Sequence, residues 1–160
     1  MVIVVMGVAA SGKTTVGHLL AEELGWTFYD ADDFHPRANV EKMSHGIPLD
    51  DEDRRPWLEA LRELIKECLS LGRDAVLACS ALKESYREYL QIEERVKLVF
   101  LEADRALIRE RLTERSGHFM KADMLESQFA ALEEPEESTH FDASRPPAEL
   151  VREIRERLNV

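Results

Sequence analysis

The sequence from Gly7 to Thr14 fits the pattern G-x-x-x-x-G-K-[ST], which is that of a phosphate-binding loop. An apolar, β-branched run over Val2–Met6 precedes the loop, and a helical pattern over Thr15–Leu24 follows it. A strand, a glycine loop and a helix in this order bring backbone N–H groups and the positive end of a helix to an anion. The N-terminal part of the chain is therefore predicted to bind phosphate.

The residue types in this loop suit a nucleotide. Gly7 and Gly12 let the backbone approach phosphate groups where a Cβ atom would intrude. Lys13 has the length to reach β- and γ-phosphate oxygens, and the Thr14 hydroxyl is a ligand for Mg²⁺. ATP with Mg²⁺ is the expected cofactor. The remaining candidate cofactor-binding residues in and beside the loop are Val8, Ala9, Ala10, Ser11 and Thr15.

The composition predicts one globular domain over residues 1–160. Hydrophobic residues make up 44% of the chain and charged residues 33%, as in soluble proteins. The formal net charge of −11 argues against a general nucleic-acid or anionic-membrane binder, because both need a basic face. An anionic small-molecule substrate stays compatible with this charge. No apolar run is long enough for a signal sequence or a membrane span, so the cytoplasm is the expected location.

The cysteines and histidines show no metal-binding pattern. Cys68 falls on the apolar face of a predicted helix and Cys79 at the end of a predicted strand, so both are predicted to be buried, reduced thiols. The five histidines lack a ligand spacing such as HExxH. We therefore expect no structural zinc site.

Strand-like and helix-like segments alternate along the rest of the chain, which predicts a parallel sheet covered by helices on both faces. Right-handed crossovers place every strand-to-helix loop at one edge of such a sheet. The glycine loop, Asp30–His35 and Ser80–Lys83 are therefore expected to meet in space. The further predicted strands cover residues 26–29, 75–79, 97–101 and 140–142, and the further predicted helices begin near residues 37, 49, 84, 104, 121 and 146.

The class of phosphate-binding protein follows from what accompanies the loop. The chain has no Asn-Lys-x-Asp guanine signature, which counts against a GTPase. Ser80 follows a strand where many ATPases have an acidic residue, which counts against a motor. A compact kinase remains. The predicted fold is α/β, a three-layer P-loop NTPase fold like that of nucleoside monophosphate kinases, with a five-stranded parallel sheet and a helical lid at approximately residues 116–132.

Five blocks, in the same order and over most of the chain, resemble the gluconokinase family, which phosphorylates D-gluconate on its 6-hydroxyl with ATP. Ala9 and Ala10 stand where that family often has Ser or Gly, and Ala31 where Gly is common. The blocks are the glycine loop; Asp30–Pro36 with Asn39, Lys42, Met43, Gly46, Pro48 and Leu49; Asp53–Leu58; Cys79–Lys83 with Tyr86 and Arg87; and Gly117–Met120 followed by Ser127–Phe129 with Leu132, Glu133 and Pro135.

The resemblance implies a site for the acceptor opposite the glycine loop. Asp32 is expected to orient the attacking hydroxyl or accept its proton, and Asp30 to face Mg²⁺ through water. Arg54 is the candidate for the gluconate carboxylate, because a guanidinium binds carboxylates with two parallel hydrogen bonds. His35, before a proline, suits a gluconate contact and a structural role equally. The other candidate acceptor-site residues are Ser80, for which a helix cap is the alternative, and Arg87.

Two arginines and a histidine are assigned to the lid. Arg111 and Arg115 lie four residues apart and therefore on one face of a helix. They are expected to neutralise the transferring phosphate or to stack on adenine, with Arg115 in the catalytic set beside Lys13 and Asp32. An ion-pair network with neighbouring glutamates is the alternative. His118 is expected in the moving lid, which excludes water, and in the substrate-binding set.

Other functions stay open at the level of the sequence. A shikimate-type or nucleotide-type kinase would have the same fold. A regulatory module would bind ATP without acceptor-dependent release of ADP, and a small GTPase-like switch would prefer GTP. The resemblance also implies a homodimer, with a small molecule rather than nucleic acid or membrane as the substrate.

Overall fold

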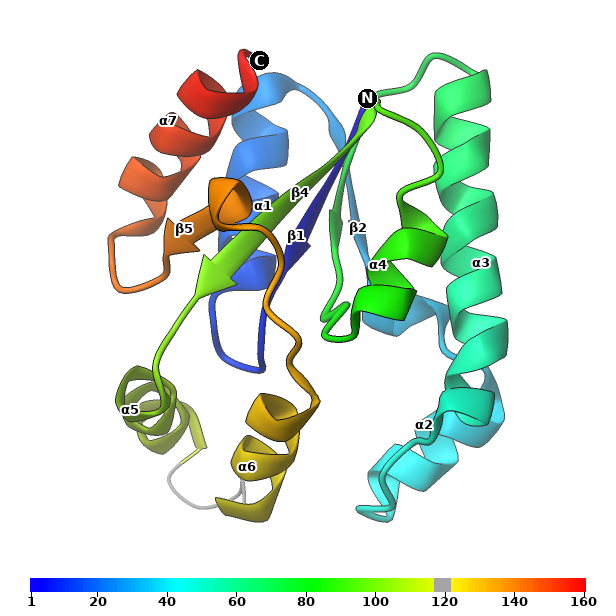
Figure 1. The fold of residues 1–160 in the computed structure, drawn as a ribbon, viewed down its shortest axis with the longest axis vertical. Coiled ribbons are helices and arrows are strands. Elements are labelled where there is room, and N and C mark those ends of the chain that lie inside the picture. Colours follow the sequence, from blue (N-terminus) through cyan, green and yellow to red (C-terminus); the bar gives the residue numbers. More distant parts are fainter. Residues whose placement is uncertain (117–121) are drawn as a thin grey trace.

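The computed structural model describes residues 1–116 and 122–160, and its centre is a sheet of five parallel strands (Figure 1). The strands are β1 (Val2–Met6), β2 (Thr27–Asp30), β3 (Ala75–Ala78), β4 (Val96–Glu102) and β5 (His140–Asp142). Their order across the sheet is β2-β3-β1-β4-β5. The predicted five-stranded parallel sheet is confirmed, and each strand lies within two residues of its predicted position.

Helices cover both faces of the sheet, as Figure 1 shows. On one face, β1 side chains pack against α3 and α4, and on the other against α1 and α7. Val4 belongs to the first core and Ile3 to the second, because successive side chains of a strand point to opposite faces. The three-layer prediction is thus confirmed. The helices are α1 (Lys13–Leu24), α2 (Arg37–Ser44), α3 (Asp51–Ser70), α4 (Glu84–Leu90), α5 (Arg105–Ser116), α6 (Ala122–Ala131) and α7 (Pro147–Leu158), with short 3-10 helices η1 (Ala31–Phe34) and η2 (Glu137–Thr139).

A third, smaller apolar cluster joins α5 and α6 to the glycine loop. Its buried members are Val8 from the loop, Leu82 before α4, Ile108 from α5 and Leu125 from α6. Phe129 packs against this cluster from α6. The two helices beyond β4 are therefore anchored at the same edge of the sheet as the glycine loop.

Both cysteines are buried, as predicted. Burial in an apolar environment raises the pKa of the Cys79 thiol to about 12, because the thiolate would lose its hydration. Such a thiol is unreactive near neutral pH. None of the described helices is long and apolar enough to cross a membrane.

Candidate functional site

The glycine loop has the backbone geometry that its two glycines were predicted to supply. Gly7 has a φ of +152° and Gly12 a φ of +100°, both in the region that favours glycine. A Cβ atom on Gly7 would lie 2.6 Å from the Ser11 Oγ atom and 3.0 Å from the Leu101 carbonyl oxygen. Gly12 is the N-cap of α1, so that helix begins at Lys13, two residues before the predicted start. The unpaired N–H groups of the first turn of α1 therefore lie at the loop.

Two basic side chains bind carbonyl groups of the loop. The Lys13 Nζ atom donates to the Val8 carbonyl oxygen at 2.9 Å. Arg111 Nη1 donates to the carbonyl oxygens of Ala10 and Ser11 at 3.2 and 3.0 Å, and Nη2 donates to that of Ala143. Arg111 thus fastens the loop to the turn between β5 and α7. Its expected contact with ATP stays a prediction, beside this observed role in holding the loop.

The acidic residues after β2 lie close to the loop lysine. The Asp30 carboxylate accepts the Asp32 N–H at 2.9 Å and so caps η1. Although Asp32 is open to solvent on one side, desolvation by the surrounding protein raises its pKa, and the negative charge of Asp30 raises it further. The positive charge of Lys13, and that of His35 when its ring is protonated, oppose both effects. The sheet register pairs Asp30 with Ala78 and Ala78 with Val5, so the glycine loop and Asp30–His35 begin at the same edge of the sheet, as predicted.

His35 is held from two sides. Its imidazole stacks on the Trp57 indole with ring centroids 4.7 Å apart. Asn39, which is buried, donates from Nδ2 to the Asp53 carbonyl oxygen at 2.7 Å, and the same nitrogen lies 3.3 Å from His35 Nδ1. His35 Nδ1 is therefore assigned as the acceptor, which leaves the proton of the neutral ring on Nε2. Burial lowers the pKa of His35, and nearby Arg54 adds to this while Asp32 opposes it.

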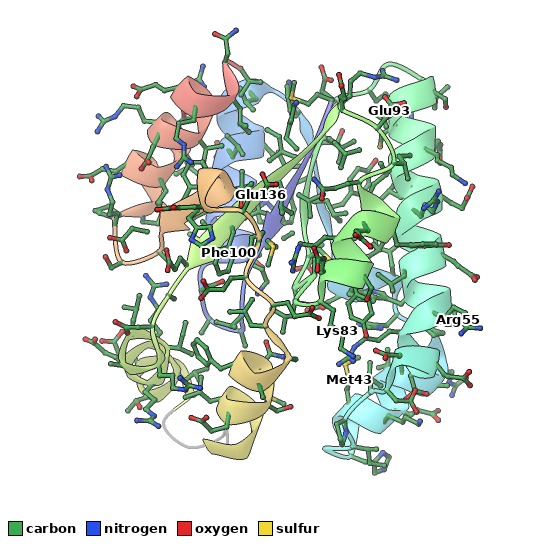
Figure 2. The ribbon with its side chains drawn as sticks, in the orientation of Figure 1. Met43, Arg55, Lys83, Glu93, Phe100 and Glu136 are labelled. Atoms are coloured by element: carbon green, nitrogen blue, oxygen red, sulfur yellow. The ribbon has the colours of Figure 1, made fainter. Side chains whose placement is uncertain are left out.

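Arg54 lies in a cluster of polar side chains from α3 and the start of α4. Its Nη1 donates to the Tyr86 hydroxyl at 3.4 Å, and that hydroxyl donates to the Asp51 carboxylate. Lys83 Nζ donates to the same carboxylate at 2.7 Å, and Figure 2 shows Lys83 between α4 and the first turn of α3. The hydrogen bond with Lys83 lowers the pKa of Asp51. Arg55, by contrast, points away from the cluster into solvent (Figure 2).

The loop after β3 joins the site through its backbone. The Ser80 carbonyl oxygen accepts the Gly7 N–H at 3.4 Å, so this loop also meets the glycine loop as predicted. Arg87 is only 5% exposed, and its Nη1 donates to the carbonyl oxygens of Ala81 and Leu82 at 3.1 and 3.0 Å. Arg87 thus holds the loop in shape, and its contact with an acceptor stays a prediction.

The remaining candidate residues differ in what the structure says of them. Thr14 and Thr15 are exposed in the first turn of α1, next to the glycine loop. The Arg115 side chain and His118 lie outside the described residues, so the roles assigned to them stay predictions.

Sequence reasoning missed several side chains that build the site. Trp57 belongs to a block of the family resemblance but had no assigned function, yet its Nε1–H donates to the Ala31 carbonyl oxygen at 2.7 Å and fixes η1. Asn39, Tyr86 and Gln128 had no assigned role, although the Gln128 Oε1 atom accepts the Ala9 N–H of the glycine loop at 3.1 Å. The available signal was their presence in the blocks that carry the family resemblance.

Comparison with known proteins gives consistent matches. The family model described as shikimate kinase matches residues 9–159. A gluconokinase from Gluconobacter oxydans is 49% identical, over 83% of this chain and 75% of that protein. A probable gluconokinase from Xenopus tropicalis is 43% identical, over 96% of this chain and 91% of that protein. The crystal structure of a gluconokinase from Sinorhizobium meliloti matches with a TM-score of 0.88 at 42% identity, over 98% of this chain and 90% of that chain.

Proposed function

This chain belongs to the family that the shikimate kinase model describes and, within it, to the gluconokinases, and we propose on that basis that it transfers the γ-phosphate of ATP to the 6-hydroxyl of D-gluconate. The observation that supports the reaction best is the register of the sheet, which brings the acidic segment after β2 and the phosphate loop after β1 to the same edge, with Asp32 within the influence of the Lys13 charge. Phosphoryl transfer needs positioning and charge stabilisation above all, and these two groups supply one each.

Lys13 offsets charge on the β- and γ-phosphates, while Asp32 orients the attacking hydroxyl. The raised pKa of Asp32 suits a group that takes up the hydroxyl proton as the new bond forms, because a stronger base accepts that proton more readily. The first-turn N–H groups of α1 add further hydrogen bonds to phosphate oxygens.

Arg54 binds the gluconate carboxylate. The Tyr86 hydroxyl, itself bonded to Asp51, accepts a hydrogen bond from the guanidinium, and a guanidinium already held in place loses less side-chain entropy on binding. His35 adds an Nε2–H donor for a gluconate hydroxyl, since Asn39 fixes the other ring nitrogen as an acceptor. Ser80 and Arg87 are the further acceptor-site residues of this proposal.

The oxygen-rich residues beside the loop fit Mg²⁺. Thr14 presents an exposed hydroxyl, and the charges of Asp30 and Asp32 repel each other, a repulsion that a divalent cation would relieve. Asp30 and Thr14 would hold the ion, which supplies neutralisation of the phosphate oxygens when bound. The proposal also assigns the segment at 116–132, with Arg115 and His118, to a lid that excludes water.

Release of ADP from ATP and Mg²⁺ tests this function against a panel of acceptors: D-gluconate, other aldonates, shikimate and nucleoside monophosphates. The proposal predicts turnover with D-gluconate and at most slow release with the others. Fast release with shikimate or a nucleotide instead would contradict the acceptor assignment. Nucleotide binding without any acceptor-dependent release would replace the kinase by an ATP-binding regulatory module.

A further inference from the structure

Gln128 joins α6 to the phosphate loop through a polar contact. Its Oε1 atom accepts the backbone N–H of Ala9 at 3.1 Å, across 119 residues of sequence. Gln128 is half-buried, and the third apolar cluster holds its helix in place through Leu125 and Phe129, which lie three residues before it and one after it. Leu125 is thus a helix-face neighbour of Gln128, at i,i+3, and of Phe129, at i,i+4. The carboxamide is therefore held at the loop by its helix as well as by its hydrogen bond.

The contact lies at the end of the loop that meets the terminal phosphates. Ala9 follows Val8, whose carbonyl oxygen is bound by the Lys13 ammonium. In nucleotide-binding loops of this kind the lysine contacts the β- and γ-phosphates. Gln128 and Lys13 thus reach the same two-residue stretch of backbone, Gln128 at an N–H group and Lys13 at a carbonyl.

The Gln128 carboxamide has two donors that its contact with Ala9 does not use. An amide side chain has an acceptor oxygen and two N–H donors on Nε2. The bond to Ala9 uses the oxygen alone, so it leaves both Nε2 donors available. A donor pair held beside a phosphate loop, with its partner oxygen already anchored, suits an anionic oxygen.

We propose that Gln128 contacts the γ-phosphate of ATP through Nε2 while its Oε1 atom stays on the Ala9 N–H. This inference rests on the proposed function for the identity of the nucleotide, and it adds a phosphate-binding residue from α6 to that site. It also gives α6 a role in binding, since the helix would then contact ATP, which has a γ-phosphate, but not ADP, which lacks one.

The test compares binding of ADP and of a non-hydrolysable ATP analogue, both with Mg²⁺, by calorimetry. Gln128→Glu keeps an oxygen for the Ala9 N–H but puts a negative charge where the donors were. Its Kd for the ATP analogue should rise about tenfold or more, the range expected for loss of a hydrogen bond to a charged group, with the Kd for ADP changed less than about threefold. Gln91→Glu makes the same charge change at an exposed position at the end of α4 and should alter neither value.

Gln128→Met provides a second variant of similar length without donors or charge, in case the glutamate disturbs the fold. It should also weaken the ATP analogue selectively. Equal loss of ATP-analogue and ADP affinity in either variant would overturn the proposal, because it would show that Gln128 only supports the loop. Unchanged affinity for both nucleotides would overturn it too. No acceptor is present in these measurements, so their outcome is independent of whether gluconate is the substrate.

Discussion

The His35 imidazole lies flat against the Trp57 indole, with ring planes 9° apart and centroids 4.7 Å apart. The same indole donates its N–H to the Ala31 carbonyl oxygen at 2.7 Å. One side chain of α3 therefore sets the position of η1, which carries Asp32, and of the ring that follows it. The geometry of the proposed acceptor site depends on this packing of a helix against a loop.

Replacing Trp57 by Phe should loosen the acceptor site more than the nucleotide site. The variant keeps an aromatic ring but leaves the Ala31 carbonyl oxygen without its donor, which should lower the free energy of unfolding by about 1–3 kcal/mol. The KM for gluconate should rise several-fold, while the KM for ATP should change little. Trp26→Phe, in the core on the other face of the sheet, is the control and should leave both KM values unchanged. Equal effects of the two variants on the gluconate KM would refute the role of Trp57.

Arg54→Ala should separate binding of the acceptor from binding of ATP. Removal of a charged hydrogen-bonding group from a carboxylate site should raise the KM for gluconate by about tenfold to a hundredfold, with little change for ATP. Arg55→Ala removes the same charge one residue later, at an exposed side chain near Glu52, and should leave both constants as in the wild type. If the two variants behave alike in steady-state assays, Arg54 does not bind the acceptor.

Asp32→Asn should raise the thermal stability of the protein near pH 7 and lower its activity. Because the pKa of Asp32 is raised in the folded protein, the folded state binds more protons than the unfolded state between the ordinary aspartate pKa of 3.8 and the raised value. Stability therefore falls as pH rises through that window, and the ionised form stays unfavourable above it. The Asn variant should melt at a higher temperature than the wild type near pH 7 and lose this advantage below about pH 4.

The same variant should lose turnover by about 10²-fold to 10⁴-fold, the usual contribution of a positioned acid–base group. In the wild type, kcat/KM should begin to fall on acidification above the ordinary aspartate pKa, as Asp32 takes up a proton. Calorimetric melting at pH 7 and at pH 3.5, together with a pH–rate profile, measures both effects. A lower melting temperature of the Asn variant at pH 7 would show that the Asp32 carboxylate stabilises the fold.

Lys13→Met should abolish turnover while the protein still folds. Loss of a preorganised positive charge at the transferring phosphate should cost about 100-fold or more in kcat. The circular dichroism spectrum should stay that of the wild type, because Lys13 Nζ donates to the carbonyl oxygen of Val8 in the loop and Lys13 belongs to none of the apolar clusters of the core. Retained activity would remove Lys13 from the reaction.

Much of the fold was predictable because its signals are local. The strands are short apolar runs bounded by turns. Because β1 is buried on both faces, its sequence is apolar throughout and is easily assigned to a strand. The phosphate loop is a continuous motif, and the position of Asp32 follows from the rule that loops at the ends of parallel strands meet. These features need no knowledge of side-chain packing.

The parts that escaped prediction depend on tertiary contacts between distant segments. Trp57 recurs at helical spacing with other core residues, and nothing in that pattern shows where its N–H points. Arg111 was expected to contact ATP or neighbouring glutamates, whereas its guanidinium bonds three carbonyl groups that lie far away in sequence. Gln128 reaches Ala9 only because an apolar cluster docks α6 on the loop. Such partners are set by packing rather than by residue type.

Hydrogen bonds link the acidic segment after β2 to α2 and to the start of α3. Asp50 and Asp53 cap α3 reciprocally, Lys42 and Asn39 both bind Asp53, and Trp57 binds Ala31. The segment from Asp30 to Trp57 is thus cross-linked within itself, while its Asp51 and Arg54 side chains also bind Lys83 and Tyr86 at α4. An exchange of acceptor preference between related kinases should therefore transplant the whole segment together with Lys83 and Tyr86. A transfer of Asp30–His35 alone would omit α3, whose Trp57 holds that loop in place.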